Sequence, residues 1–365
     1  MTDVCAITKG MEMEDGFYKV LILVPLLAAM LIMPVRVSAA ELTPVSQELD
    51  VALGTVGRAT TLEDNLHVGP NSELNMDVKY VASPQINKDL LLRVGAEWQR
   101  FSFASRQHAA VPDTLQQANA IVGLDYQLAE QWLMRVEAQP GLYGDFRQLN
   151  WRSFDAPIIL GFAYLIDADL QWFFGLRVDV RSQYPVFPAV GVRWKFTDVW
   201  TLDLQLPNPR LEYDVSDKFQ AYLGVGILAG TYTVGNHFGN DHGLPQLNHA
   251  TVDYTEVRLG PGFSWKARPN LTLEAEGGYV LYRTWDFFDQ HIKMSSHPLP
   301  YLQIAVHARF WTPFAFESII STDPDTICPA AILAQVYIHL LPQPSAPSSA
   351  TLLPDMCHFL HTPIN

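Results

Sequence analysis

The chain has 365 residues, with 24 Lys and Arg against 38 Asp and Glu, and a formal net charge of −14 at pH 7. This acidic balance argues against nucleic acid as a partner, because phosphate contacts need a basic surface. Three cysteines are too few for a disulfide framework.

The N-terminus has the layout of a secretory signal peptide. Residues 20–35 are almost wholly apolar, Lys19 precedes them, and the small residues 37–40 follow. A basic residue, an apolar core and small residues in that order are typical of a leader that is cleaved on export. The apolar run is short for a membrane-spanning helix and holds two prolines, which disfavours the alternative of a single anchor helix. We therefore predict a signal peptide over 1–40, with translation starting at an internal methionine because a leader begins with a short basic segment.

The region from residue 41 to Phe310 is predicted to consist of β-strands. Apolar and polar residues alternate along it, as at Leu202, Leu204 and Leu206, and alternation is the pattern of a strand whose side chains point to opposite faces. In chain order, the predicted strands span 46–57, 73–83, 89–102, 117–128, 131–142, 155–167, 170–182, 187–197, 200–206, 209–216, 219–234, 252–266, 271–287 and 300–310. The first of them is poorly patterned, and 207–209 reads as either a turn or a kink, so about 14 strands are predicted, with 12 as the alternative.

Short turns alternate with long polar stretches between these strands. The short turns carry Asp, Asn, Pro or Ser, which suit tight turns, and they fall at 129–131, 167–169, 197–199, 216–218 and 268–270. The long stretches carry Gly, His and Pro and fall at 58–72, 104–116, 143–154, 235–251 and 288–299. Outer-membrane barrels have short periplasmic turns, long outer loops and an even strand number. We therefore predict a transmembrane antiparallel up-and-down β-barrel over 41–310, in the outer membrane of a Gram-negative bacterium.

The two faces of the predicted strands differ in charge. One face is apolar and almost uncharged, whereas a soluble β-sandwich carries charge on its outward face. Because a charge in hydrocarbon costs about 2–4 kcal/mol at the midplane while a lumen can be wet, the uncharged face is predicted to meet lipid. We predict that the other face lines the lumen with Arg93, Glu97, Arg135, Glu137, Arg177, Asp179, Arg193, Lys195, Arg210, Glu212, Glu256, Arg258, Glu274 and Glu276. These mixed signs fit either charged rings that set the selectivity of a conduit or mutual pairs in a structural wall.

Aromatic residues are predicted to form the two interfacial girdles of a membrane barrel. Near the short turns stand Tyr126, Trp132, Trp172, Trp194, Phe196, Trp200 and Trp265. Near the opposite strand ends stand Tyr143, Tyr184, Phe187, Tyr232, Tyr254, Tyr279, Trp285 and Phe287.

The last predicted strand, 300–310, ends in an aromatic residue. Its apolar face holds Leu302, Ile304, Val306, Ala308 and Phe310. This pattern is similar to the terminal-strand signal that the barrel-assembly machinery reads. We therefore predict that these five residues form an assembly signal, and that the partners of the protein are this machinery and outer-membrane lipid.

Five stretches carry a family resemblance: NPRLEY (208–213), AYLGV (221–225), GTYTV (230–234), VDYTEVR (252–258) and GGYVLYR (277–283). Together they resemble a bacterial outer-membrane β-barrel family catalogued as a domain of unknown function, number 6268. The resemblance covers most of 75–310; it implies an outer-membrane barrel and no established activity. Residues 311–365 depart from the family pattern, with many Pro, no Lys or Arg and no clear period. We expect this tail to be a disordered extension or a reading-frame artefact.

Metal-binding and catalytic patterns are weaker than the barrel pattern. Histidines gather in the predicted outer loops, at His67, His108, His237, His242, His249, His291 and His297. Imidazole suits Zn or Cu, but no fixed ligand spacing is present. Ser264 and His307 share the lumen face two strands apart, with no local motif that ties a nucleophile to an oriented base.

These observations lead to one functional prediction and two alternatives. No nucleophile-elbow, phosphate-loop or dinucleotide motif is present, so we predict no enzyme activity and no cofactor. The predicted function is a narrow passive channel for small polar solutes. The alternatives are a structural barrel without conductance and an outer-membrane hydrolase.

Overall fold

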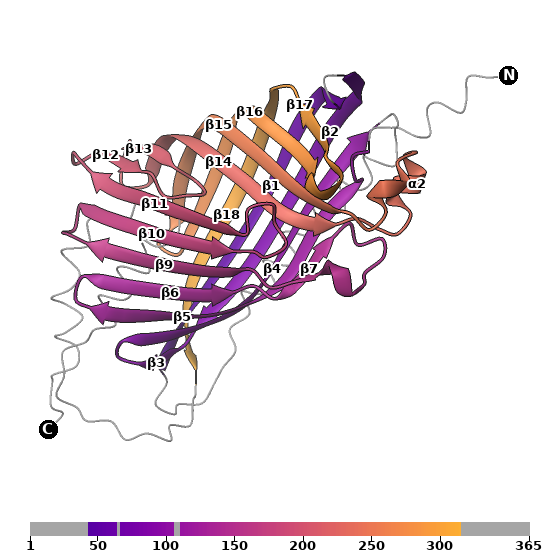
Figure 1. The fold of residues 1–365 in the computed structure, drawn as a ribbon. Coiled ribbons are helices and arrows are strands. Elements are labelled where there is room, and N and C mark those ends of the chain that lie inside the picture. The colour runs from indigo at the N-terminus through magenta and orange to yellow at the C-terminus, as the bar shows by residue number, and fades with distance from the viewer. Residues whose placement is uncertain (1–42, 64–65, 106–109, 315–365) are drawn as a thin grey trace, which may run out of the picture. The chain divides into compact units, whose positions relative to one another are not determined.

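A computed structural model describes residues 43–63, 66–105 and 110–314 (Figure 1). The predicted signal peptide, 1–40, lies outside the described residues, as does the predicted tail beyond Phe314. In the part of the chain that the structure describes, no helix is both long and apolar enough to cross a membrane.

The described chain is almost entirely β-structure. In chain order, the strands are β1 (Thr43–Glu63), β2 (Leu66–Ser83), β3 (Gln85–Asn87), β4 (Leu90–Ser105), β5 (Thr114–Ala129), β6 (Trp132–Ala138), β7 (Gly141–Gly144), β8 (Phe154–Asp155), β9 (Ile158–Leu165), β10 (Leu170–Val178), β11 (Val186–Lys195), β12 (Trp200–Asp203), β13 (Arg210–Asp214), β14 (Phe219–Thr233), β15 (Thr251–Arg268), β16 (Leu271–Phe287), β17 (Ile292–Ser296) and β18 (Leu299–Phe314). The helical turns are η1 (Trp151–Ser153), α2 (Phe238–Asp241), η2 (Pro245–Leu247) and η3 (Phe288–Gln290).

The strands form one closed antiparallel barrel. Neighbours along the chain pair with each other, and β1 closes the ring by pairing with both β2 and β18. β3, β7, β8 and β17 continue longer strands across a break, so the eighteen segments make fourteen strands. β12 and β13 pair antiparallel with each other, which makes 204–209 a turn rather than a kink. The prediction of fourteen strands is therefore confirmed over the alternative of twelve.

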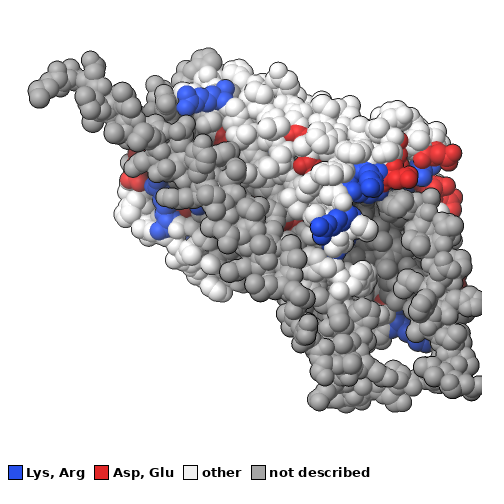
Figure 2. Space-filling view, turned by 180° about the vertical axis from the view of Figure 1, so that it is seen from behind, with Lys and Arg blue, Asp and Glu red and all other residues white. Residues whose placement is uncertain are grey.

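Burial alternates along the strands and separates an inner from an outer face. In β5, Ile121 and Asp125 are almost fully buried, whereas Val122 and Leu124 are 49% and 42% exposed. Successive side chains point to opposite faces, so the buried set lines the inside of the closed sheet and the exposed apolar set covers the outside. On the face shown in Figure 2, charged side chains gather mainly towards the two ends and the surface between them is mostly uncharged. This apolar exterior is the surface that a barrel presents to lipid.

Short turns gather at one end of the barrel, named here the turn end. In the turn between β9 and β10, Asp167 Oδ1 accepts hydrogen bonds from the backbone N–H groups of Asp169 and Leu170, at 2.9 and 2.8 Å. Thr197 and Ser216 accept backbone N–H groups in the same way in two further turns. These local bonds are the reason that Asp, Ser and Thr stop a strand here. The longer connections lie at the opposite end, named the loop end.

At the loop end, strand pairing runs further than the sequence pattern indicates. The long loop predicted over 58–72 is wrong, because β1 and β2 stay paired up to Glu63 and Leu66. The stretch 288–299 likewise contains β17, which pairs with both β16 and β1. Backbone hydrogen bonds need no apolar side chains, and a strand that passes beyond the hydrocarbon can be polar on both faces. The alternation that marks a membrane strand is therefore lost before the strand ends.

The barrel wall is uneven in height. β12 and β13 have four and five residues, whereas β1, β15 and β16 have 21, 18 and 17. β13 pairs with β14 only as far as Gly224, and the turn between β12 and β13 reaches Ile227, whose N–H donates to the Pro207 carbonyl at 3.0 Å. The described strand pairings of β14 from Leu228 to Tyr232 are with β15 alone. The β14–β15 hairpin therefore rises above the low wall of β12 and β13, which leaves it free to bend across the loop end.

Candidate functional site

The structure places all fourteen charged lumen candidates on the inner face of the barrel. Eight of them are buried: Arg93, Glu137, Asp179, Arg193, Glu212, Glu256, Arg258 and Glu274. The other six are half-buried: Glu97, Arg135, Arg177, Lys195, Arg210 and Glu276. Ion pairs and hydrogen bonds bring most of them into four local groups between the turn end and the loop end. That these side chains line a path for solutes stays a prediction.

One ion-pair group lies on β4, β5 and β6. The Arg93 guanidinium is 3.1 Å from a Glu137 carboxylate oxygen and 3.9 Å from an Asp125 oxygen. Asp125 also accepts two hydrogen bonds from Arg135, at 2.7 and 2.8 Å. Glu48 of β1 approaches Arg93 to 4.0 Å from the other side. These buried charges are compensated within a few neighbouring strands, which is what burial requires of them.

A second group lies on β11, β12 and β13, where the wall is low. Arg193 donates to Asp203 at 2.5 Å and to Glu212 at 3.2 Å. Glu212 also accepts from the Gln220 amide at 3.4 Å. The three strands are consecutive, so this group also lies along the wall rather than across the lumen.

A third group reaches from β13 to β16. Arg210 makes a two-pronged contact with Glu274, both bonds being 3.2 Å, and its guanidinium lies 4.3 Å from the centre of the Tyr222 ring. His307 joins the group, with Nδ1 at 2.7 Å from Asp50 and Nε2 at 3.8 Å from Glu274. His307 was expected on the lumen face, whereas Asp50 was not among the predicted lumen charges, although the alternation of β1 places it inward.

The geometry around His307 does not support the hydrolase alternative. A hydrolytic nucleophile has to hydrogen-bond to its base. The base that Ser264 would need, His307, is instead held by two carboxylates. The Ser264 hydroxyl is buried without a hydrogen-bond partner among the described residues.

A fourth group, near the loop end, is the most deeply buried. Glu73 of β2 lies 3.1 Å from Arg283 and 3.4 Å from Arg258, and none of its side chain is exposed. The Tyr254 hydroxyl is 2.7 Å from carboxylate oxygens of both Glu73 and Glu256, and Arg258 also pairs with Glu256. Sequence reasoning missed Glu73 and Arg283. Glu73 is one alternation step from Asn75 in the predicted strand and could have been found. Arg283 could not, because a register shift between Val257 and Arg258, opposite Tyr282 and Val280, changes which residues of β16 point inward.

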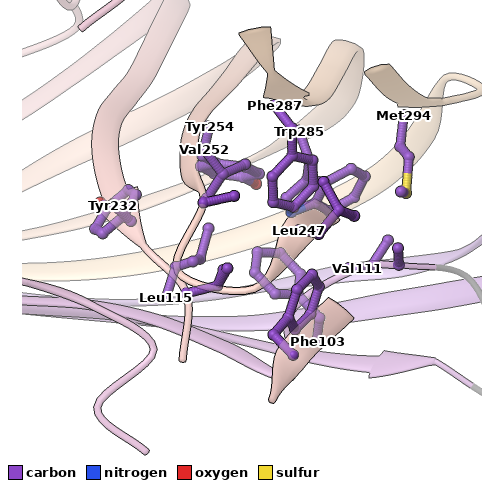
Figure 3. Close-up of a cluster of buried hydrophobic side chains, with 14 of the residues drawn as sticks. Phe103, Val111, Leu115, Tyr232, Leu247, Val252, Tyr254, Trp285, Phe287 and Met294 are labelled. Carbon is purple, nitrogen blue, oxygen red and sulfur yellow. The ribbon is translucent and has the colours of Figure 1, made fainter. Parts of the chain in front are cut away.

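Between this group and the loop-end connections, a set of buried apolar residues fills the loop end of the barrel. This set, named the mouth cluster, consists of Phe101, Phe103, Ala110, Val111, Leu115, Tyr143, Tyr232, Val234, Phe238, Leu247, Ala250, Val252, Tyr254, Trp285, Phe287 and Met294. Figure 3 shows side chains from separate strands converging on one another. The rings of Phe101 and Tyr254 are 4.8 Å apart between centroids, and those of Phe103 and Trp285 are 5.2 Å apart. Four strands separate β4 from β15 in the wall and three separate β4 from β16, so these contacts reach across the lumen.

The mouth cluster corrects the prediction of the outer aromatic girdle. Five of its eight expected members are buried inside the barrel: Tyr143, Tyr232, Tyr254, Trp285 and Phe287. Tyr254 and Trp285 are two residues from Glu256 and Arg283, and in a strand that spacing puts them on the same inward face. Tyr184, Phe187 and Tyr279 are exposed, as a girdle requires. At the turn end, all the expected aromatics are exposed or half-buried.

A backbone bridge also crosses the loop end. Thr233, at the end of β14, pairs in parallel with Gly144 of β7, and the Asp145 N–H donates to the Thr233 carbonyl at 3.1 Å. Five strands separate β7 from β14 in the wall. A Cβ at position 144 would collide with the Thr233 carbonyl oxygen, so glycine is what permits this approach. The bridge anchors the β14–β15 hairpin inside the barrel mouth.

The loop histidines do not gather into a metal site in the described part of the chain. No group of three or more His, Cys, Asp or Glu side chains there could hold an ion. His242 Nδ1 lies 2.7 Å from the Phe238 carbonyl oxygen, within its own short helix. His108 lies outside the described residues.

Comparison with known proteins gives a family and a set of distant structures. A family model described as "Domain of unknown function (DUF6268)" matches residues 62–309. No protein with a curated description matches the chain. An outer membrane channel from Pseudomonas putida F1 is 11% identical, with 76% of this chain and 100% of that chain covered and a TM-score of 0.40. The P. putida toluene transporter TodX is 9% identical, with 73% of this chain and 90% of that chain covered and a TM-score of 0.35. The NanC porin is 10% identical, with 73% of this chain and 100% of that chain covered and a TM-score of 0.32.

Proposed function

The chain belongs to the DUF6268 family, and we propose that it is a passive channel of the Gram-negative outer membrane for small polar solutes. The observation that carries this proposal is the contrast between the two faces of a closed barrel, ionic inside and apolar outside. A polar interior behind an apolar exterior is how membrane barrels hold water. Fourteen strands also lie between the small barrels that side chains fill and the open porins of 16–18 strands.

Two of the four ion-pair groups favour a path along the barrel axis, whereas the Arg210 and Glu73 groups each join strands that are not neighbours. The Arg93 and Arg193 groups each lie along neighbouring strands, so their charges are neutralised at the wall. The narrowest part of the channel is then the mouth cluster, where aromatic rings meet across the lumen. An apolar constriction can close a channel by excluding water. We therefore propose a channel that the β14–β15 hairpin keeps narrow.

The mouth cluster also favours one alternative, a structural barrel without conductance, and planar-bilayer recording separates the two. Two buried residues of the β14–β15 connection, Phe238 and Leu247, can be replaced together, as Phe238→Ser with Leu247→Ser. We expect the variant to conduct more, and for longer openings, than the unmodified protein, because the inserted connection loses its apolar anchor. Trp265→Ala, on the outer face at the turn end, is the control and should leave conductance unchanged. Silence of both proteins at every voltage would support the structural barrel instead.

The charges on the inner wall lead to an expectation about ion selectivity, which the same planar-bilayer recordings can measure. Arg193 and Lys195 lie on the inward face of β11. Replacing both, as Arg193→Gln with Lys195→Gln, leaves the carboxylates of Asp203 and Glu212 without their cation. We expect the reversal potential in a salt gradient to shift towards cation preference, because a ring of acidic residues favours cations. Lys218→Gln, on an exposed turn, should not shift it. An unchanged potential in the double variant would place the path of ions elsewhere.

A further inference from the structure

A cavity of about 530 Å³ lies among the loop-end connections, beside the mouth cluster, with which it shares Ala250. Its lining comes from four separate segments: η1 with the start of β8, the connection after β10, the connection before β15, and η3. This volume falls within the range of pockets that bind small organic ligands. The residues that give the cavity its chemistry are Trp151, Arg152, Phe154, Arg181, His249 and Gln290, and one carboxylate, Asp289, also lines it, so that two cations stand against one acid.

One wall of the cavity is an aromatic platform. The rings of Trp151 and Phe154 stack with centroids 5.4 Å apart and planes 8° apart. Trp151 is nevertheless 83% exposed, so its second face is available to a ligand. Exposing a whole indole to water costs hydrophobic free energy, and a flat apolar ring beside polar groups is a surface suited to another molecule's apolar face.

The platform is held in place by the structure around it. The Arg152 N–H donates to Asn150 Oδ1 at 2.8 Å, and the Arg152 carbonyl accepts from the Thr233 hydroxyl at 2.8 Å. Arg181 donates to the Phe154 carbonyl at 3.1 Å and to the same Thr233 hydroxyl. The platform is thus tied to the end of β14 that crosses the barrel. A ligand would therefore bind without the entropic cost of ordering Trp151 and Phe154.

The polar lining has unused bonding capacity. His249 Nδ1 and Gln290 Oε1 are buried and have no hydrogen-bond partner among the described residues. A buried polar atom without a partner is costly, by about 1–3 kcal/mol, and both residues line the cavity, where a rotation of either side chain would let a ligand supply the missing bond. The guanidinium of Arg152 makes no ion pair with any described residue, so a cation is also available at the rim.

From this combination we infer that the cavity binds an acidic saccharide. The apolar C–H face of a sugar ring stacks on an aromatic platform, its hydroxyl groups use amide and imidazole partners, and its carboxylate or phosphate pairs with the two arginines. The source of the saccharide is either a free oligosaccharide or the sugar part of a lipid on the cell surface, since both present the same chemistry. This site does not depend on whether the barrel conducts.

The test is titration of the purified full-length protein, in detergent, with two oligosaccharides of equal length. We expect the acidic trigalacturonate to bind saturably and the neutral maltotriose to bind at least about tenfold more weakly, which is a difference of about 1.4 kcal/mol. Trp151→Ala should weaken trigalacturonate binding by about tenfold or more, because it removes the stacking surface. Arg152→Gln should weaken trigalacturonate binding until its affinity is close to that of maltotriose, because the cation that pairs with the acidic group is lost. Tyr184→Ala replaces another exposed loop-end aromatic that does not line the cavity, and it should change neither affinity.

A second arm distinguishes the two sources. The protein is incubated with phosphatidylcholine vesicles that either contain or lack lipopolysaccharide, and retention on each is compared for the unmodified protein and Trp151→Ala. Loss of lipopolysaccharide-dependent retention in the variant supports the site and identifies a lipid-linked sugar. Saturable trigalacturonate binding without such retention supports the site and identifies a free one. Absence of both, or equal binding by the Trp151 variant while it still shows the gel shift of a folded barrel, overturns the inference.

Discussion

Glu73 illustrates what single residues do in this barrel. Its carboxylate has no exposed surface and pairs with two buried arginines, Arg258 and Arg283. Forming such a pair does not by itself stabilise a fold much, because both charges lose their hydration. Removing one partner is different, since the remaining charges stay buried without compensation.

We therefore expect Glu73→Gln to lower the free energy of unfolding by about 3–5 kcal/mol. The measurement is urea unfolding in lipid vesicles, followed by the loss of the fast-migrating folded band on a gel. Asp113→Asn is the matched control, because Asp113 pairs with Arg147 while both side chains are more than half exposed. An exposed pair contributes about 0–1 kcal/mol, so the control should be nearly neutral. Equal effects of the two substitutions would mean that Glu73 is hydrated in the folded protein.

At the level of elements, sequence patterns predict strands well where lipid meets the wall and poorly elsewhere. β5 alternates strictly, since one face meets hydrocarbon and the other the interior, and its predicted span of 117–128 lies within the observed Thr114–Ala129. The ends of β1 and β2 and the whole of β17 were missed, because strands beyond the membrane need no apolar face. The mouth cluster was missed for a further reason. A register shift in β16 turns Trp285 and Phe287 inward against the alternation of Glu274 and Glu276. Which inward aromatics meet also depends on strands far apart in the chain.

The strand that closes the barrel, β18, leads to a prediction about assembly. β18 pairs with β1 from Tyr301↔Val56 to Phe314↔Thr43, four residues beyond the predicted terminal Phe310. A chain that ends at Phe314 keeps every pair of this seam, so we expect it to reach the outer membrane as well as the full chain does. Phe310→Ala should insert less efficiently, because it removes the terminal aromatic of the proposed assembly signal. The readout is the fraction of cellular protein that shows the folded gel band.

Trp311→Ala is the control for this experiment, since it changes a neighbouring exposed aromatic outside the five-residue pattern. Equal insertion of Phe310→Ala and Trp311→Ala would show that assembly does not read position 310.

On the scale of the whole molecule, the division into an apolar outer face and a polar inner face decides which substitutions the protein tolerates in a bilayer. Val122 is 49% exposed on the outer face of β5, whereas Gln99 of β4 points inward and pairs in register with Gln117. We expect Val122→Arg to destabilise the protein in a bilayer by about 2–4 kcal/mol, and Gln99→Arg to have a smaller effect. Urea unfolding in vesicles measures both. Equal tolerance of the two substitutions would mean that the exterior does not face hydrocarbon.

The low wall at β12 and β13 has a consequence for the surrounding lipid. Four or five residues at about 3.3 Å each span roughly 13–17 Å, less than the apolar band of about 25 Å that a membrane barrel normally presents. Above this hairpin, before β14 turns into the mouth, Leu228, Ala229 and Gly230 are half-buried or exposed and offer backbone groups that no described strand on that side pairs. Acyl chains cannot hydrogen-bond to such groups, and each one exposed to them costs several kcal/mol. The outer leaflet beside β12 and β13 is therefore expected to thin, or the barrel axis to tilt, until headgroups and water reach the bare edge of β14.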